Sequence, residues 1–273
     1  MSATVLVSGA GSGIGAAITA TLHAEGWTVG VLDRDGVAAR EVAGALGERA
    51  VAIVADAAEE HPIEAALDAF AAITGRPAPD ALVANAGIVR FGPLLDLAAA
   101  DWRIVVDVNL TGTFLLARAA ARRMVAAEQP GSIVAVTSMN GVAAGPNAGA
   151  YGATKAAVAL LVQQMAIEWG PHGIRANAVA PGLIDAGMSA PIYADDDVRR
   201  RRTERVPLGR LGTGADVAEL VAFLLSDRAA YVTGTEVLVD GGVTGSIIAT
   251  LPRPASVEGP DAEGASAGED GGG

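Results

Sequence analysis

Short runs of apolar residues alternate with longer stretches rich in alanine and leucine over most of the chain. A run of about four to eight mainly β-branched residues bounded by Gly, Pro or Asp is typical of a buried strand. A longer Ala/Leu-rich stretch that ends at glycine is typical of a helix. The pattern predicts strands at residues 4–7, 27–32, 50–54, 81–84, 132–138, 174–180 and 236–239. It predicts helices near residues 14–25, 36–46, 63–74, 99–127, 151–169 and 215–226.

Regular alternation of strands and helices indicates a parallel sheet that is covered by helices on both faces. Right-handed crossovers then give a doubly wound α/β sheet of about seven strands, a Rossmann-type fold. Such a sheet binds its ligands in a crevice at the carboxyl ends of its strands. We therefore expect residues 1–251 to form a single domain whose site lies at that edge of the sheet.

Two segments depart from the alternation of strands and helices. Residues 183–206 contain three aspartates at 195–197 and four arginines at 199–202. A charge run of this kind is typical of a solvated face, and its place after the sixth predicted strand indicates a mobile flap over the substrate. Three successive aspartates cannot all face one ion, so no metal site is expected. Residues 252–273 are rich in Pro, Gly, Ala, Ser and acids, which predicts a disordered acidic tail.

Composition narrows the range of partners. The chain has 273 residues, of which 51% are hydrophobic, and a formal net charge of -12, which argues against a nucleic-acid partner. It has no cysteine, which excludes disulfides and thiolate catalysis and fits a reducing cytosol. No basic leader is evident, and no unbroken apolar run nears the roughly 18 residues of a membrane span. We expect a cytoplasmic protein without a membrane or nucleic-acid partner.

A glycine-rich turn, Ser-Gly-Ala-Gly-Ser-Gly-Ile-Gly at residues 8–15, joins the first predicted strand to the first predicted helix. Glycines let the backbone approach a pyrophosphate, and the helix N-terminus supplies amide donors, although a plain flexible turn is the alternative. Asp33, at the end of the second predicted strand, is placed to accept hydrogen bonds from an adenosine ribose. Its charge would repel a 2′-phosphate, which favours NAD over NADP, whereas Arg34 beside it could pair with a phosphate.

Tyr151 and Lys155 are four residues apart, so they share one face of a predicted helix, and Ser138 ends the strand before it. A phenol has an unperturbed pKa of about 10 and is a poor base at neutral pH. A neighbouring ammonium lowers that pKa, and a hydroxyl can hold the substrate oxygen. These groups make a general acid/base site for interconverting an alcohol and a carbonyl, whereas a Tyr-x-x-x-Lys pair alone is typical of a solvated helix face.

Taken together, these residues resemble the short-chain dehydrogenase/reductase family over roughly residues 3–244. The resemblance implies a catalytic set in which Tyr151 exchanges the proton, Lys155 also binds the ribose hydroxyls, Ser138 positions the substrate oxygen and Asn109 holds a water that links Lys155 to solvent. The residues implied to contact the cofactor are Gly9, Ser12, Gly13, Ile14, Gly15, Asp33, Arg34, Asp56, Ala57, Asn85, Ala86, Gly87, Tyr151, Lys155, Pro181, Gly182 and Ile184.

Two positions depart from the family pattern. Ser8 stands where threonine is usual, and Ala186 replaces a threonine that commonly bonds the cofactor. The second departure leaves Ser189 or a water molecule to hold the nicotinamide end. The resemblance also implies a homotetramer with the helices near 99–127 and 151–169 as interfaces.

The sequence thus predicts an NAD-dependent oxidoreductase that interconverts a secondary alcohol and a ketone by hydride transfer. Residues 139–146 and 188–193 carry few charges, so we expect them to line the pocket of an apolar or alicyclic small molecule. One alternative is an NADP-linked 3-oxoacyl or polyketide ketoreductase, against which Asp33 and Ser12 count. Another is a non-catalytic sensor or scaffold that binds NAD, against which the complete catalytic set argues.

Overall fold

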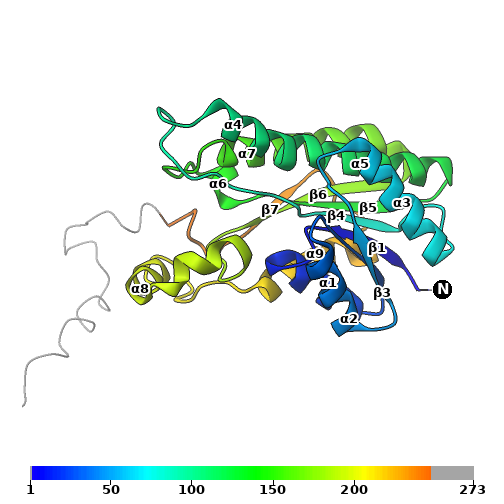
Figure 1. Ribbon diagram of the computed structural model, residues 1–273, viewed down its shortest axis with the longest axis horizontal. Helices are drawn as coiled ribbons and strands as arrows, with labels where there is room; N and C mark the ends of the chain where they lie inside the picture. The colour runs from blue at the N-terminus through cyan, green and yellow to red at the C-terminus, as the bar shows by residue number, and fades with distance from the viewer. Residues whose placement is uncertain (1, 247–273) are drawn as a thin grey trace, which may run out of the picture.

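The computed structural model describes residues 2–246, in which a parallel sheet lies between two layers of helices (Figure 1). The sheet has seven strands in the order β3-β2-β1-β4-β5-β6-β7, and every neighbouring pair is parallel. This order confirms the predicted doubly wound fold. The strands are β1 (Thr4–Ser8), β2 (Thr28–Asp33), β3 (Ala50–Val54), β4 (Ala81–Ala84), β5 (Gly131–Val136), β6 (Ile174–Pro181) and β7 (Glu236–Val239).

Helices connect successive strands and divide between the two faces of the sheet (Figure 1). The main helices are α1 (Gly13–Ala24), α2 (Gly36–Leu46), α3 (Glu60–Thr74), α4 (Ala99–Val106), α5 (Gly112–Ala126), α7 (Tyr151–Trp169) and α9 (Gly214–Leu225). Shorter helical segments are η1 (Asp107–Thr111), α6 (Met139–Val142), η2 (Gly170–His172), η3 (Gly187–Ala194), α8 (Asp196–Thr203) and η4 (Asp227–Ala229).

Both faces of the sheet are buried, which is why its strands read as nearly continuous apolar runs. On one face Leu6 and Leu82 pack in a cluster with residues of α3, α5 and α7. On the other face Val5 and Val83 pack in a cluster with residues of α1, α2 and α9. The chain turns outward in opposite directions from the β1–β4 pair, so a crevice opens there at the carboxyl ends of the strands.

One helical stretch, Ala99–Ala126, is long and apolar enough to cross a membrane by length and composition alone. Half of its most apolar window is buried inside the protein. Leu116 and Met124 in α5 belong to the core cluster that also contains α3 and α7 residues. Packing in that core therefore accounts for much of its apolar character.

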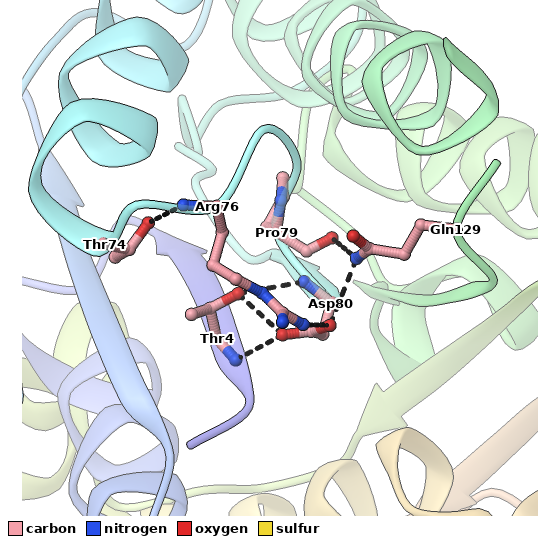
Figure 2. A network of polar contacts seen from close by, with 6 residues as sticks. All are labelled: Thr4, Thr74, Arg76, Pro79, Asp80 and Gln129. Atoms are coloured by element: carbon pink, nitrogen blue, oxygen red, sulfur yellow. Dashed lines mark hydrogen bonds and ion pairs between the residues drawn. The ribbon is translucent and has the colours of Figure 1, made fainter. Parts of the chain in front are cut away.

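A polar network fixes the opposite, amino-terminal edge of the sheet (Figure 2). The Asp80 carboxylate, just before β4, accepts hydrogen bonds from the backbone amide and the hydroxyl of Thr4 in β1, each at 2.8 Å. It pairs with Arg76 and accepts a 3.1 Å hydrogen bond from the side-chain amide of Gln129, which precedes β5. One carboxylate thus joins the starts of the three central strands.

The structure differs from the sequence prediction in two of these elements. Strand β5 ends at Val136 and not at residue 138, so Ser138 lies beyond the sheet as the N-cap of α6. The stretch predicted as one helix over 99–127 contains a π-helical turn, η1. Residues 183–206, the predicted flap, contain η3 and α8, and their mobility stays a prediction. The predicted acidic tail, residues 252–273, lies outside the described residues.

Candidate active site

The glycine-rich turn after β1 has no room for side chains at its closest points. Gly9 and Gly13 adopt positive φ angles of 63° and 55°. A Cβ on Gly15 would lie 2.0 Å from the carbonyl oxygen of Gly9, and one on Gly13 would lie 2.7 Å from the Cα of Gly187. The turn therefore requires glycine, and its backbone amides at the start of α1 remain close to the crevice.

Ser8 joins this turn to the loop after β4. Its hydroxyl oxygen accepts hydrogen bonds from the backbone amides of Asn85 and Ala86, both at 3.1 Å. The Asn85 side-chain amide donates back to the carbonyl oxygens of Ser8 and Gly9, both at 3.0 Å. A hydroxyl is all that this arrangement needs, so the serine in place of the family's usual threonine preserves it.

Asp33 ends β2 with its carboxylate held in a fixed orientation. One oxygen accepts a 2.9 Å hydrogen bond from the backbone amide of Gly11, and the other accepts a 3.0 Å bond from the backbone amide of Asp35. Each carboxylate oxygen has further acceptor capacity for ribose hydroxyls. Arg34 beside it is exposed and lines the same cavity.

Three functional groups meet where β5 and α7 approach each other. Ser138 follows β5 and caps α6, accepting a 3.2 Å hydrogen bond from the backbone amide of Asn140. Tyr151 begins α7, and Lys155 lies one turn further along it. The Lys155 ammonium is buried, donates a 2.7 Å hydrogen bond to the carbonyl oxygen of Val136, and lies 5.7 Å from the centre of the Tyr151 ring.

Burial sets the pKa values of this pair. Burial raises the pKa of the Tyr151 phenol, and interaction with the Ser138 side chain partly offsets that rise. Burial lowers the pKa of Lys155 to about 8. Desolvation is the largest influence on the pKa of the Tyr151 phenol, and the Lys155 ammonium donates its hydrogen bond to a backbone carbonyl. The lowering of the Tyr151 pKa by Lys155 that the sequence predicts stays a prediction.

Asn109 lies in the π-helical turn η1 and is fully buried. Its side-chain oxygen accepts a 2.8 Å hydrogen bond from the backbone amide of Ile88, and its side-chain amide donates to the Ile88 carbonyl oxygen and the Thr154 hydroxyl. These bonds join the loop after β4 to α7. A Cβ on Gly87 would lie 3.4 Å from both the Asn109 side-chain oxygen and the Lys155 ammonium, so the two groups flank the same small space.

A continuous cavity of about 640 Å³ lies along the carboxyl edge of the sheet. All of the predicted cofactor-binding residues line this cavity, namely Gly9, Ser12, Gly13, Ile14, Gly15, Asp33, Arg34, Asp56, Ala57, Asn85, Ala86, Gly87, Tyr151, Lys155, Pro181, Gly182 and Ile184. Ser138 also lines it, whereas Asn109 lies behind the wall. Ala186 and Ser189 also line it.

Sequence reasoning missed several residues of this wall, among them Gly187 and Arg202. Gly187 packs against Gly13, so the segment after β6 contacts the glycine-rich turn. Arg202 of α8 lines the cavity although it belongs to a charge run that predicts a solvated face. No signal in the sequence separates Arg202 from its three arginine neighbours, because only the folded position of α8 turns one of them inward.

Comparison with known proteins identifies the family. Residues 9–244 match the family model described as enoyl-(acyl carrier protein) reductase. The crystal structure of a short-chain type dehydrogenase/reductase from Mycobacterium marinum has a TM-score of 0.83 to this fold, at 33% sequence identity over 89% of this chain and 95% of that chain. The chain belongs to the short-chain dehydrogenase/reductase family.

Two further members of the short-chain dehydrogenase/reductase family are similar over nearly their full lengths. The (3R)-3-hydroxyacyl-CoA dehydrogenase of Rattus norvegicus is 40% identical, with 89% of this chain and 96% of the relative covered. The cis-4-hydroxycyclohexanecarboxylate dehydrogenase of Sinomonas cyclohexanicum is 43% identical, with 88% of this chain and 95% of the relative covered. The predicted enzyme class is confirmed: the chain is an oxidoreductase that interconverts a secondary alcohol and a ketone, and its family binds a nicotinamide cofactor.

Proposed function

We propose that this short-chain dehydrogenase/reductase uses NAD to interconvert a secondary alcohol and a ketone, with Tyr151 as the general acid/base. The observation that carries the proposal is the position of Tyr151, Ser138 and Lys155 in the same cavity as the glycine-rich turn and Asp33. A tyrosine on a helix far from any nucleotide-binding feature could not assist a hydride transfer to a bound cofactor. Here one continuous cavity holds both the proton-exchanging groups and the features that suit a dinucleotide.

The cavity wall fits a dinucleotide in its details. The Gly9–Gly15 turn admits no side chain at its closest approach, which suits a pyrophosphate against the backbone. Asp33 would hold the adenosine ribose, and Asp56, with its carboxylate fixed by a 2.9 Å bond from the Ala58 amide, would face the adenine. Asn85–Gly87 would lie beside the adenosine, and Pro181, Gly182 and Ile184 beside the nicotinamide. When bound, the cofactor supplies the acceptor or donor of the hydride.

The side chains at the other end of the cavity handle the proton. In alcohol oxidation the Tyr151 oxygen accepts the proton of the substrate hydroxyl, and in ketone reduction it returns that proton. The Ser138 hydroxyl donates a hydrogen bond to the same substrate oxygen. Because burial raises the pKa of Tyr151, the phenol form favours reduction at neutral pH, and oxidation speeds up as pH rises.

The substrate-side wall favours a small molecule with an apolar body. Met139, Pro146, Met188 and Ile192 line the cavity there. Contact with such residues excludes water from an aliphatic or alicyclic ring and stabilises its binding. The relative named for cis-4-hydroxycyclohexanecarboxylate supports an alicyclic alcohol as the substrate type.

The preference for NAD depends on Asp33, and kinetics with both cofactors test it. We expect the wild-type protein to oxidise members of a secondary-alcohol panel with a kcat/KM for NAD at least about tenfold above that for NADP, because the carboxylate repels a 2′-phosphate. Asp33→Ala removes that repulsion beside Arg34 and shifts the ratio toward NADP. Asp35→Asn, a neighbouring exposed change, serves as the control and leaves the ratio unchanged.

The outcomes of this experiment separate the candidate functions. Equal use of both cofactors, or a wild-type preference for NADP, would contradict the assignment of Asp33. An NADP preference joined to activity on 3-oxoacyl thioesters would favour the NADP-linked ketoreductase.

A cytoplasmic homotetramer completes the proposal. Helices α4, α5 and α7 expose large apolar side chains, among them Trp102, Phe114, Leu160 and Ile167. Apolar residues on the outward faces of these helices suit packing against other copies of the chain. Light scattering in solution distinguishes a tetramer from a monomer. The cysteine-free composition supports the cytoplasm as the location, which fractionation of the source cells tests.

A further inference from the structure

Helix α8 carries four consecutive arginines at residues 199–202, and carboxylates neutralise three of them. The ion pairs are Arg199–Asp185 at 2.7 Å, Arg200–Glu204 at 2.8 Å and Arg201–Asp197 at 2.8 Å. Arg200 also pairs with Asp197 at 2.6 Å. Within residues 2–246, the ion pairs of the structure include none with Arg202. One guanidinium of the four is thus left for another partner.

A partner can reach Arg202 from inside the cavity. Its side chain is half-buried and lines the cavity, whereas Arg200 and Arg201 are exposed and do not. Its guanidinium carbon lies 5.6 Å from the centre of the Tyr193 ring, which is itself only 2% exposed and lines the same cavity. Arg199 lies 5.8 Å from that ring and donates a 3.1 Å hydrogen bond to the Tyr193 carbonyl oxygen. Arg202 therefore packs against the Tyr193 ring, and Arg199 bonds the backbone of the same tyrosine.

No other charged residue of the described cavity lining lies on the η3–α8 side to bind or repel an anion beside Arg202. Asp33, Arg34 and Asp56 lie at the ends of β2 and β3, in the part of the wall that suits the adenosine. Lys155, whose ammonium donates to the Val136 carbonyl oxygen, lies beside Tyr151 and not on the η3–α8 side. On the η3–α8 side the described lining residues other than Arg202 are uncharged. A cation in a mainly apolar wall attracts an anion more strongly than the same cation in water.

We propose that Arg202 binds a carboxylate of the substrate, so that the enzyme acts on secondary alcohols whose apolar body carries one carboxylate apart from the reacting carbinol. A guanidinium presents paired donors that match the two oxygens of a carboxylate. The inference rests on the proposed function for the reaction itself. It also changes the substrate expected from the sequence, from a purely apolar molecule to an apolar molecule with one negative end.

Binding of two matched probes tests the inference without requiring turnover. Cyclohexanecarboxylate and cyclohexanecarboxamide share a ring and nearly a shape, and only the first is charged. Calorimetry on the full chain with saturating NAD should show the carboxylate binding at least about tenfold more tightly than the amide. Arg202→Gln should abolish that difference, and Arg202→Lys should restore part of it. Arg201→Gln, a change at the exposed neighbour, should keep it.

Two results would overturn the inference: wild-type protein that binds the carboxylate no better than the amide, or a preference that survives in Arg202→Gln. If Arg202 instead held a cofactor phosphate, Arg202→Gln would weaken NAD binding and leave the probe preference unchanged, which also counts against it. Thermal melting of each variant verifies folding. Turnover of 4-hydroxycyclohexanecarboxylate and its carboxamide is measured separately. Loss of oxidation with both, alongside an intact binding preference, would overturn the proposed function alone.

Discussion

Lys155 shows how strongly the folded surroundings of one residue determine its chemistry. Spacing from Tyr151 places it on the correct helix face, and that much follows from the sequence. Its pKa of about 8 follows from burial beside the Val136 carbonyl, which depends on how α7 packs on β5. Likewise, the raised pKa of Tyr151 comes from desolvation and not from the residue pattern. The residues of the site were predictable, whereas their protonation states were not.

The lowered pKa of Lys155 makes a prediction about stability. An unfolded lysine has a pKa of about 10.4, so between about pH 8 and pH 10.4 the unfolded chain binds more protons than the folded chain. The free energy of unfolding contributed by this residue therefore rises with pH across that window and is least favourable below pH 8. Across the window, the wild type should gain on the order of 3 kcal/mol relative to Lys155→Met.

Urea unfolding of both proteins at several pH values from 7 to about 10.4 measures this difference. Taking the difference between the two proteins cancels the titration of groups that they share. Parallel stability curves for wild type and Lys155→Met would contradict the assigned burial effect.

At the scale of elements, hydrophobic periodicity predicts the strands and the long helices, because each of them buries a regular face. It does not predict the π-helical turn η1, since the apolar pattern runs unbroken through 99–127 while Asn109 turns inward to bond Ile88 and Thr154. Nor does it predict α8, whose sequence is almost entirely charged. The fold of 183–206 depends on contacts with distant segments, such as the pairing of Ile184 with Gly212.

The Asp80 network leads to a prediction at this scale. Asp80→Ala removes an acceptor that joins β1, β4 and the segment before β5, and it leaves the Thr4 amide and hydroxyl without their partner. Because the side chain is only 22% exposed, we expect a loss of about 2–4 kcal/mol in the free energy of unfolding. Chemical denaturation measures it.

Asp68→Ala is the matched control for Asp80→Ala. Asp68 is 74% exposed and pairs with Arg123, so its loss should cost at most about 1 kcal/mol. Both variants should retain turnover under native conditions, since Asp80 precedes β4 at the amino-terminal edge of the sheet, whereas the cavity lies at the carboxyl edge. Equal losses of unfolding free energy in the two variants would contradict the prediction that the Asp80 network stabilises the fold more than an exposed ion pair does.

At the scale of the whole molecule, the strand order brings distant segments into one cavity. The order reverses direction at β1 and β4, so the glycine-rich turn, Asn85 and the start of α7 meet at one edge although they lie far apart in the chain. The alternation of strands and helices suffices to predict that these segments lie close together, because the carboxyl ends of parallel strands all lie at the same edge of the sheet. The substrate-side wall was only partly predictable, because it depends on how η3 and α8 fold back over that edge.

The central claim is that Tyr151 exchanges the substrate proton, and turnover of Tyr151→Phe tests it most directly. The change removes the phenol oxygen and keeps the ring, so NAD binding should persist by fluorescence titration. Tyr231→Phe, at a fully exposed tyrosine, is the control and should retain wild-type turnover. We predict that Tyr151→Phe lowers NAD-linked alcohol oxidation about 10²–10⁴-fold. Retention of more than about a tenth of wild-type turnover would contradict the account.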